Sequence, residues 1–527
     1  MSWAARRRRH FQEQPCQRHI RADGDRSSRI SLKRIATLYF GPYTRVRALQ
    51  KPRHMAGIVS YGAYVPFLKI SRAEIAKAWD IPALPGDRSV ANRDEDSLTM
   101  AVEAGLNALI GVDPKEIDLL YFATTTPPYL ERQCAAIIAA ALDLQRHIST
   151  ADFTATTRAA TAALKAAIDA VESGAAKKAL VVAADMRPGE PQTAWEQLTG
   201  DAAAAVVVGR DAQLVVRGFS SVAGEALGPW RRPQDRFVRS FEPKVETEYG
   251  YVRLTVEAAK EALAKTGIGP ADLSRVVLYS PDHRSPLEVI GRLGIDRQRL
   301  QDPLLFSVGN AGAAHALLVL ASALDQAQKG EKILVLNYGD GADAFVISVE
   351  GTIWRPQDRP TIAQLLEARR PLPNYGAYSS LRNLVGREGP TAQVSPVTYW
   401  RDIAMELRWH GARCENCGLV QFPIPRVCRQ CGSRDRLQEI SLSRRGTIYT
   451  YTLDHLYAGD YLDTPVPRAV IDLEGGGRVF LEVTDCHPSE VTWGMPVEIT
   501  FRCLHEWGGY HNYYWRARPL RIKVGGE

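Results

Sequence analysis

Cysteine is scarce in this sequence, and so is any long uninterrupted run of apolar residues. The chain of 527 residues has eight cysteines, which are too few for a disulfide framework over such a length. Four of them form two closely spaced pairs, a usage typical of metal binding in the reducing cytoplasm. No apolar run reaches the roughly 18–20 residues of a membrane-spanning helix. The sequence therefore predicts a cytoplasmic protein with no membrane partner.

The chain also lacks a strong charge of one sign outside its first residues. Its formal net charge is +7, yet residues 1–54 alone hold 14 Lys+Arg against 3 Asp+Glu. Residues 399–527 contain 16 Lys+Arg and 16 Asp+Glu, whereas a nucleic-acid-binding surface needs an excess of cations. We therefore predict no nucleic-acid partner, although the aromatic run Tyr513, Tyr514 and Trp515 could stack on bases instead of packing in a core or on another domain.

Residues 1–54 are rich in arginine and have no clear hydrophobic periodicity. They lack the apolar core of a secretory signal. The favoured interpretation is an over-extended start, because Met55 opens the strand pattern MAGIVSYGAYVP. A disordered basic tail and an organellar presequence are the alternatives.

From Met55 to Gly351, predicted strands and helices alternate. KEIDLLYFATTT and KKALVVAADM have the pattern of buried strands, and AATAALKAAIDAVESG that of a helix ending at a glycine. This alternation of strands and helices predicts a mostly parallel sheet covered by helices. The region also contains a duplication, because TMAVEAGLNALIGVDPKEIDLLYFATTTP resembles RLTVEAAKEALAKTGIGPADLSRVVLYSPD, and a second matched pair of segments follows in the same order.

The remaining sequence divides into three parts. Residues 352–398 are rich in Pro and Gly, and we interpret them as a linker that could cover part of the first domain. Residues 399–437 predict a short helix and a zinc ribbon. Residues 438–527 predict a small β-barrel of short strands joined by Gly-rich turns.

The strongest motif is a pair of Cys-x2-Cys sequences separated by ten residues, formed by Cys414, Cys417, Cys428 and Cys431. Two such turns facing each other give tetrahedral sulfur coordination, which suits Zn²⁺. Four protein sulfurs leave no open coordination position, so we expect a structural zinc. Free thiols, a redox pair and iron in place of zinc are the alternatives.

Six stretches of the first domain carry a family resemblance: DRSVANRDEDSLTMAVEA (87–104), ADFTATTRAATAALKAAIDAVESG (151–174), QLTGDAAAAVVVG (197–209), WRRPQDRF (230–237), FSVGNAGAAHALL (306–318) and NYGDGADAF (337–345). By these stretches the domain resembles the hydroxymethylglutaryl-CoA synthase branch of the thiolase superfamily. RCENCGLVQFPIPRVCRQCGS and the strand G-x-x-Y-T-Y-T are similar to an acyl-CoA-associated family that joins a rubredoxin-like zinc ribbon to an OB fold. Together they imply a duplicated five-layer α/β thiolase-like fold, followed by a zinc ribbon and an OB-type barrel.

The resemblance also implies where reactive residues should lie. Thr125 stands where the family has its acid/base glutamate, Thr157 where it has its nucleophilic cysteine, and Tyr279 where it has its histidine. Asn310 matches the asparagine of the family's Gly-Asn pair. All three principal reactive groups therefore differ from the family pattern.

A threonine at a helix entrance is a poor nucleophile, because its hydroxyl is a very weak acid and needs a neighbouring base. Arg158 is a cation, and Asp152 lies on the preceding strand. We therefore expect Thr157 to cap the helix rather than to carry an acyl group. Cys134 lies in an apolar helix, where a buried core cysteine is the default and a replacement nucleophile the alternative.

Some relatives in the superfamily are retro-aldolases that use tyrosines and work beside a zinc-ribbon/OB partner. By that resemblance Tyr279 is a candidate acid/base, with Asn310 or helix N–H groups holding an enolate. A strand-end tyrosine packing on the linker is the alternative for Tyr279, and His283 and Tyr338 are secondary candidates.

The function predicted from these residues is aldol or retro-aldol chemistry on a β-hydroxyacyl-CoA, with CoA as part of the substrate. The alternative is a non-catalytic acyl-CoA-binding scaffold that accompanies a separate active thiolase. By resemblance we expect a homodimer.

Overall fold

The computed structural model describes residues 55–225, 228–385, 395–456 and 462–521. The expectations for residues 1–54 lie outside the described residues. Within the described part of the chain, no helix has both the length and the apolar character needed to cross a membrane.

Residues 55–349 form two repeated halves around a nine-stranded sheet, in the order β5-β4-β6-β7-β1-β8-β11-β10-β9. The strands of the first half are β1 (Gly57–Tyr64), β4 (Ile117–Ala123), β5 (Ser149–Phe153), β6 (Lys178–Met186) and β7 (Asp201–Gly209). Those of the second half are β8 (Leu214–Ala223), β9 (Arg275–Leu278), β10 (Lys332–Tyr338) and β11 (Gly341–Val349). Apart from β5, the two halves have the same strand order when read outward from the β1–β8 pairing, which confirms the duplication.

The sheet is mixed, so the prediction of a mostly parallel sheet was wrong. Three strand pairings are parallel and five are antiparallel. The reason is that β10 runs into β11 through a two-residue turn, which forces antiparallel pairing. The equivalent strands β6 and β7 pair in the same way in the first half.

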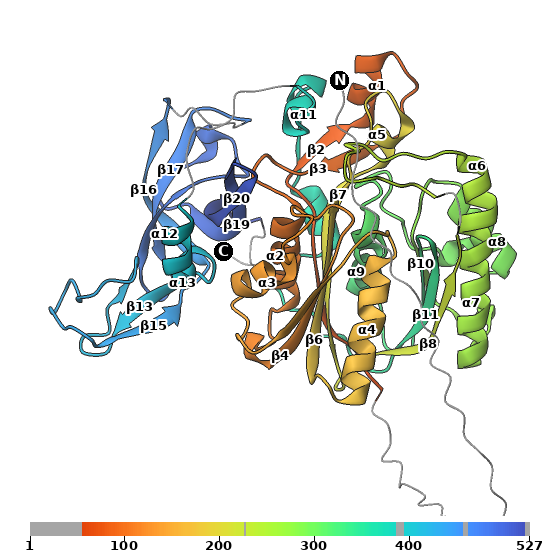
Figure 1. The fold of residues 1–527 in the computed structure, drawn as a ribbon, viewed down its shortest axis with the longest axis horizontal. Coiled ribbons are helices and arrows are strands. Elements are labelled where there is room, and N and C mark those ends of the chain that lie inside the picture. The colour runs from red at the N-terminus through yellow and green to blue at the C-terminus, as the bar shows by residue number, and fades with distance from the viewer. Residues whose placement is uncertain (1–54, 226–227, 386–394, 457–461, 522–527) are drawn as a thin grey trace, which may run out of the picture. The chain divides into compact units, whose positions relative to one another are not determined.

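Helices cover both faces of each half-sheet, which gives five layers (Figure 1). The two central helices, α4 (Ala159–Ser173) and α9 (His315–Gln326), lie between the half-sheets in one apolar cluster. The outer helices are α2 (Ser97–Ala108) and α3 (Cys134–Ala141) on one side, and α7 (Arg253–Thr266) and α8 (Ser285–Leu293) on the other. Local sequence sets their ends: Asp96 and Thr99 form a capping box that starts α2, and α4 ends at the left-handed Gly174.

Shorter elements surround this body. They are β2 (Leu68–Ser71), α1 (Arg72–Trp79), β3 (Asp87–Val90), α5 (Ala194–Leu198), α6 (Pro243–Val245), the π-helix η2 (Glu246–Val252), α10 (Ile362–Glu367), β12 (Arg370–Pro371) and α11 (Tyr375–Leu381). The last three fall in the segment interpreted from sequence as a linker. Because β12 pairs with β2, this segment packs on the first domain.

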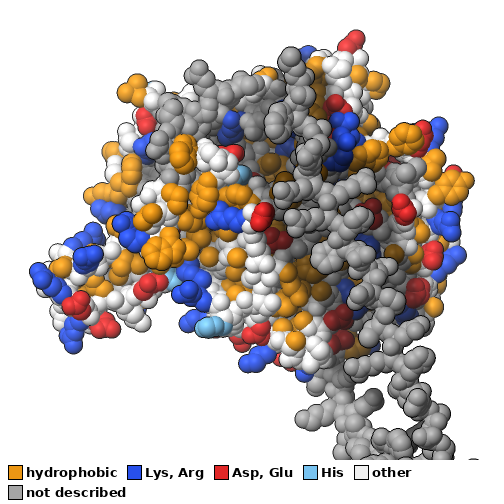
Figure 2. Space-filling view, viewed as in Figure 1, with side chains coloured by type: hydrophobic (Ala, Val, Ile, Leu, Met, Phe, Trp, Pro, Cys, Tyr) orange, Lys and Arg blue, Asp and Glu red, His pale blue; other side chains and the backbone are white. Residues whose placement is uncertain are grey.

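The C-terminal part begins with α12 (Pro396–Arg401) and α13 (Ile403–Glu406). The ribbon strands follow: β13 (His410–Cys414), β14 (Val420–Gln421) and β15 (Leu437–Ser441). The barrel strands are β16 (Arg445–Asp454), β17 (Val466–Leu473), β18 (Arg478–Glu482), β19 (Pro496–Trp507) and β20 (Tyr510–Pro519). A bridge between Val483 and Ala517 brings the two ends of this sheet together. On the visible face of this part, side chains of both charge signs are interspersed (Figure 2).

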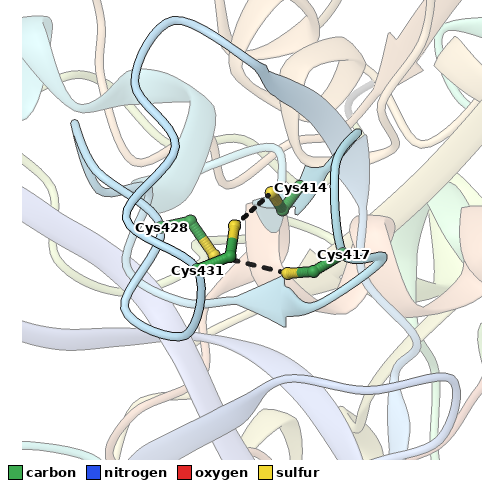
Figure 3. Close-up of side chains that lie close together, drawn as sticks. All are labelled: Cys414, Cys417, Cys428 and Cys431. Atoms are coloured by element: carbon green, nitrogen blue, oxygen red, sulfur yellow. Dashed lines mark hydrogen bonds between the residues drawn. The ribbon is translucent and has the colours of Figure 1, made fainter.

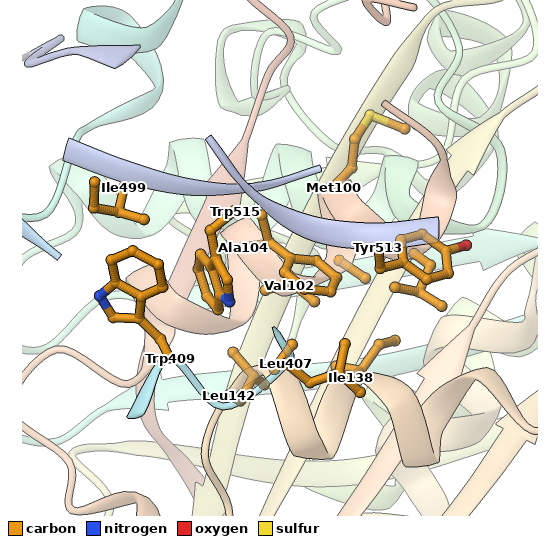
Figure 4. Packing of buried hydrophobic residues seen from close by; sticks show 14 of the residues in the cluster. Met100, Val102, Ala104, Ile138, Leu142, Leu407, Trp409, Ile499, Tyr513 and Trp515 are labelled. Atoms are coloured by element: carbon orange, nitrogen blue, oxygen red, sulfur yellow. The ribbon is translucent and has the colours of Figure 1, made fainter. Parts of the chain in front are cut away.

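The barrel and ribbon pack on the outer helices of the first half. Met100, Val102 and Ile138 of those helices share one buried cluster with Trp409 and Trp515 (Figure 4). The aromatic run predicted either to pack or to stack on bases is largely inside, because Tyr513 and Trp515 are almost fully buried.

Buried ion pairs join the same two surfaces. Arg516 contacts Asp94 at 2.6 Å, and Arg518 contacts Glu103 at 2.7 Å. Arg502 pairs with Glu95. The acidic residues come from α2 and the turn before it, and the arginines from β19 and β20, so the two domains form one packed unit.

Candidate active site

A cavity of about 550 Å³ lies at the carboxyl ends of strands from both halves. Thr125 follows β4, Arg187 follows β6 and Tyr279 follows β9, and all three line it. Tyr338, the last residue of β10, and Thr157, two residues before α4, line it too. This edge is where α/β folds commonly bind ligands, and the duplication brings both sets of strand ends to one place.

Thr125 is held by a buried aspartate. Its backbone N–H and its hydroxyl donate to Asp185 at 2.7 and 2.8 Å. Asp185 also accepts hydrogen bonds from the hydroxyls of Thr124 and Thr126 and from the backbone of Ala313. Thr125 therefore lines the cavity as part of a fixed hydrogen-bonded turn.

Thr157 does not cap α4, so that expectation was wrong. The cap position is Arg158, whose backbone N–H donates to the Thr156 hydroxyl oxygen. The Thr157 hydroxyl instead donates to the backbone carbonyl of Tyr338 at 2.7 Å. Gly339 makes this approach possible, because a Cβ there would lie 2.4 Å from the Thr157 hydroxyl oxygen.

Tyr279 is almost fully buried at the cavity wall, and Asn310 lies behind it. Burial raises the pKa of Tyr279, although Arg187 and hydrogen bonds with Asn310 and Thr157 partly oppose the rise. The Asn310 side chain donates to the Ser280 carbonyl at 2.9 Å and accepts from the Gly312 N–H. Asn310 is fully buried and is not among the lining residues.

The other candidates from sequence have different surroundings. Tyr338 lines the cavity, and its buried hydroxyl has no hydrogen-bond partner among the described residues. His283 is exposed and lies outside the cavity lining. Cys134 is buried at the start of α3, where burial and the Asp152 carboxylate raise its pKa to about 12. Among the described lining residues there is neither a cysteine nor a histidine.

The sequence analysis gave no role to Arg187 or Glu246, two of the charged residues that line the cavity. Arg187 is 5% exposed, and its Nη1 atom has no hydrogen-bond partner among the described residues. Gly312 leaves room for it, because a Cβ there would lie 2.6 Å from the Arg187 Cδ. Glu246 opens η2 and is half-buried. Arg187 could have been found from the sequence, because it directly follows a buried strand. Glu246 could not, because it lies in a π-helical turn that lacks the regular helical spacing of apolar residues.

The four ribbon cysteines converge as predicted (Figure 3). Their sulfur atoms lie within 4.8 Å of one another, and two pairs are 3.6 Å apart. Zinc–sulfur bonds of about 2.3 Å place tetrahedral sulfurs about 3.8 Å apart, so these residues fit a zinc ion. Left-handed Gly418 and Gly432 close the two turns, each donating its N–H to the carbonyl of the first cysteine.

Family models match three segments of the chain. Residues 401–435 match the ChsH2 rubredoxin-like zinc ribbon domain, and residues 439–502 match the ChsH2 C-terminal OB-fold domain. Residues 151–224, which include Thr157, match 3-oxoacyl-[acyl-carrier-protein] synthase III.

Curated relatives match more than half of the chain. Hydroxymethylglutaryl-CoA synthase of Pyrococcus furiosus is 32% identical over 346 residues, which are 64% of this chain and 99% of the relative. The enzyme of the same name from Methanocaldococcus jannaschii is 32% identical over 345 residues, 63% of this chain and 99% of the relative.

Solved structures have the same fold at lower identity. MvaS in complex with 3-hydroxy-3-methylglutaryl coenzyme A is 20% identical with a TM-score of 0.56, covering 65% of this chain and 95% of that one. The 3-oxoacyl-[acyl-carrier-protein] synthase III of Aquifex aeolicus is 24% identical with a TM-score of 0.51, covering 56% of this chain and 99% of that one.

Proposed function

This chain belongs to the hydroxymethylglutaryl-CoA synthase family of the thiolase superfamily, and on that premise we propose that it makes or breaks a carbon–carbon bond of an acyl-CoA without a covalent acyl-enzyme. Aldol or retro-aldol chemistry on a β-hydroxyacyl-CoA fits best. One observation carries the proposal: the described lining of the cavity has phenols, four carboxylates and a buried arginine, but no cysteine sulfur.

A covalent route through the existing residues is disfavoured. The Thr157 hydroxyl gives its hydrogen to a backbone carbonyl, and a hydroxyl nucleophile needs a base beside it. Asp152 is not available as that base, because it accepts the backbone N–H groups of Cys134 and Ala135 at 2.7 and 2.8 Å. The Cys134 thiol lies outside the cavity lining, and its raised pKa keeps it protonated near neutral pH.

The remaining groups suit an enolate mechanism. Because burial raises the pKa of Tyr279, its phenol is neutral and serves as a proton donor rather than as a base. Arg187 is a buried cation in the same cavity, where low polarity strengthens its attraction to negative charge on a thioester enolate. Asn310 then acts behind Tyr279, as a residue that positions the phenol.

The proposal extends to ligands and assembly. CoA is part of the substrate, in keeping with a solved structure of the same fold, HMG-CoA synthase complexed with CoA. A zinc held by the four cysteines stabilises the ribbon and takes no part in the reaction. A homodimer is the assembly that we expect from family membership.

The test is to incubate the purified protein with 3-hydroxy-3-methylglutaryl-CoA and with 3-hydroxybutyryl-CoA and to follow acyl-CoA species by liquid chromatography. Retro-aldol cleavage of either compound releases acetyl-CoA and an equal amount of a carbonyl compound. Binding of a wider panel of β-hydroxyacyl-CoAs without cleavage or condensation would instead support a non-catalytic scaffold that accompanies a separate thiolase.

A further inference from the structure

We propose that Glu246 is the general base of this cavity, the group that takes the proton from the substrate's β-hydroxyl. The inference rests on the proposed aldol chemistry. It assigns a role to a residue that lies at none of the reactive positions implied by the family resemblance.

The backbone around Glu246 is unusual. Glu246 is the first residue of η2, a π-helical segment between α6 and α7 in an otherwise continuous helical stretch. π-Helical turns are rare and occur frequently at functional sites. The same segment contributes Thr247 and Tyr251 to the cavity lining, so the turn faces the site over more than one residue.

Glu246 differs from the other carboxylates of the cavity. Four acidic residues line it: Asp235, Glu246, Asp282 and Asp340. Asp235 is bound by the Arg232 guanidinium and backbone, and Asp282 accepts the N–H groups that start α8. Asp340 is exposed. Glu246 is half-buried, and no hydrogen bond or ion pair to a described residue engages its carboxylate.

The charges around Glu246 suit proton exchange at neutral pH. Burial raises its pKa to about 7, while Arg187 lowers the pKa and Asp340 raises it. The charge of this carboxylate also raises the pKa of the Tyr279 and Tyr338 phenols, which line the same cavity. A base is most effective when its pKa lies near the working pH.

Two unpaired donors lie in the same cavity as this unpaired acceptor. The Arg187 Nη1 and the Tyr338 hydroxyl are both buried without a hydrogen-bond partner among the described residues. Buried polar groups are normally paired, so such atoms call for a ligand. A β-hydroxyacyl thioester supplies the counterparts, with a hydroxyl that donates to Glu246 and a thioester oxygen that accepts from Arg187 or Tyr338.

The step balances without any co-reactant. The Glu246 carboxylate removes the β-hydroxyl proton, the oxygen forms a carbonyl, and the Cα–Cβ bond breaks with its electron pair moving into the thioester enolate. The carbonyl compound leaves. A proton then moves to Cα and gives the shorter acyl-CoA. It comes from Glu246 directly, or from a cavity phenol that Glu246 afterwards reprotonates.

The experiment compares Glu246→Gln with the matched control Glu248→Gln, which changes an exposed residue of the same segment that does not line the cavity. Two activities are followed: cleavage of 3-hydroxy-3-methylglutaryl-CoA, and deuterium uptake at Cα of acetyl-CoA in heavy water. In Glu246→Gln we expect cleavage to fall by about 100-fold or more, with an unchanged Tm. The wild-type kcat/KM should rise with pH through about 7, and this rise should be absent from the residual rate of Glu246→Gln.

The outcomes separate the two proposals. If wild-type protein neither cleaves nor exchanges, the proposed function fails, and the assignment of Glu246 fails with it. If wild-type protein is active and Glu246→Gln keeps its rate and pH profile, the aldol function stands and Glu246 is not its base. A loss in Glu246→Gln that Glu248→Gln matches would equally overturn the assignment.

Discussion

Tyr279 lies between the cavity and a fully buried histidine. The rings of Tyr279 and His315 meet edge to face at 5.5 Å, and burial lowers the pKa of His315 to about 4. The imidazole is therefore neutral and supports the tyrosine ring without adding charge. The Tyr251 hydroxyl fixes the backbone by donating to the Tyr279 carbonyl at 2.6 Å.

Because these contacts hold the ring and backbone of Tyr279, Tyr279→Phe should leave the fold and CoA binding intact. We expect turnover of 3-hydroxy-3-methylglutaryl-CoA to fall by about 10²–10⁴-fold, the usual loss when a proton-transfer group is removed. Steady-state kinetics and calorimetric titration with CoA measure the two effects. A variant with wild-type turnover would remove Tyr279 from the mechanism.

At the level of single residues, the sequence predicted part of the site. Motif position placed Thr125, Thr157 and Tyr279, and all three line one cavity. The hydrogen-bonding role of Thr157 could not be read from the sequence, because its acceptor is the carbonyl of Tyr338, 181 positions away. Glu246 was missed because a π-helical turn interrupts the helical period on which sequence patterns depend.

At the level of elements, α2 has a second task besides covering the sheet. Asp94, Glu95 and Glu103 lie in a stretch that the sequence associated only with family membership, yet they contact barrel arginines. Burial alone would raise the pKa of Glu103, but Arg518 and then Arg502 outweigh it and hold the pKa below the ordinary 4.5. The pairing is therefore favourable to the folded state.

Replacing Arg518 by methionine should leave the buried Glu103 without its ion-pair partner, although the Thr500 hydroxyl and the Phe501 N–H still donate to it. Breaking a buried pair in this way costs about 3–5 kcal/mol in the free energy of unfolding, measurable by urea denaturation at neutral pH. The stabilisation that the charged Glu103 gives the folded state is complete above pH 4.5 and is lost as the pH falls through the lowered pKa of Glu103. The difference in free energy of unfolding between wild type and variant should therefore shrink in acid.

Arg478→Met is the matched control, because Arg478 pairs with Asp472 on an exposed face of the barrel. It should change stability little. If the two substitutions lowered the free energy of unfolding by the same amount, the buried pair would not be what holds the domains together.

For the whole molecule, the sequence identified the duplicated domain, the ribbon and the barrel, because each has a local pattern. The antiparallel pairings, which are five of the eight in the sheet, were missed, since strand direction depends on connections that composition does not reveal. Packing of the barrel aromatics on another domain was only one of the alternatives left open by the sequence, because Trp409 and Trp515 meet Met100 and Ile138 only in three dimensions. A short motif predicts its own turn, whereas an interface needs two surfaces from distant parts of the chain.

The proposed mechanism depends on a thioester cavity that offers no nucleophile. Intact-protein mass spectrometry after incubation with acetyl-CoA and an acid quench tests this most directly. We expect the mass of the protein to be unchanged. A stable gain of one acetyl group, mapped to Thr157 or Cys134, would contradict the account and restore a covalent mechanism.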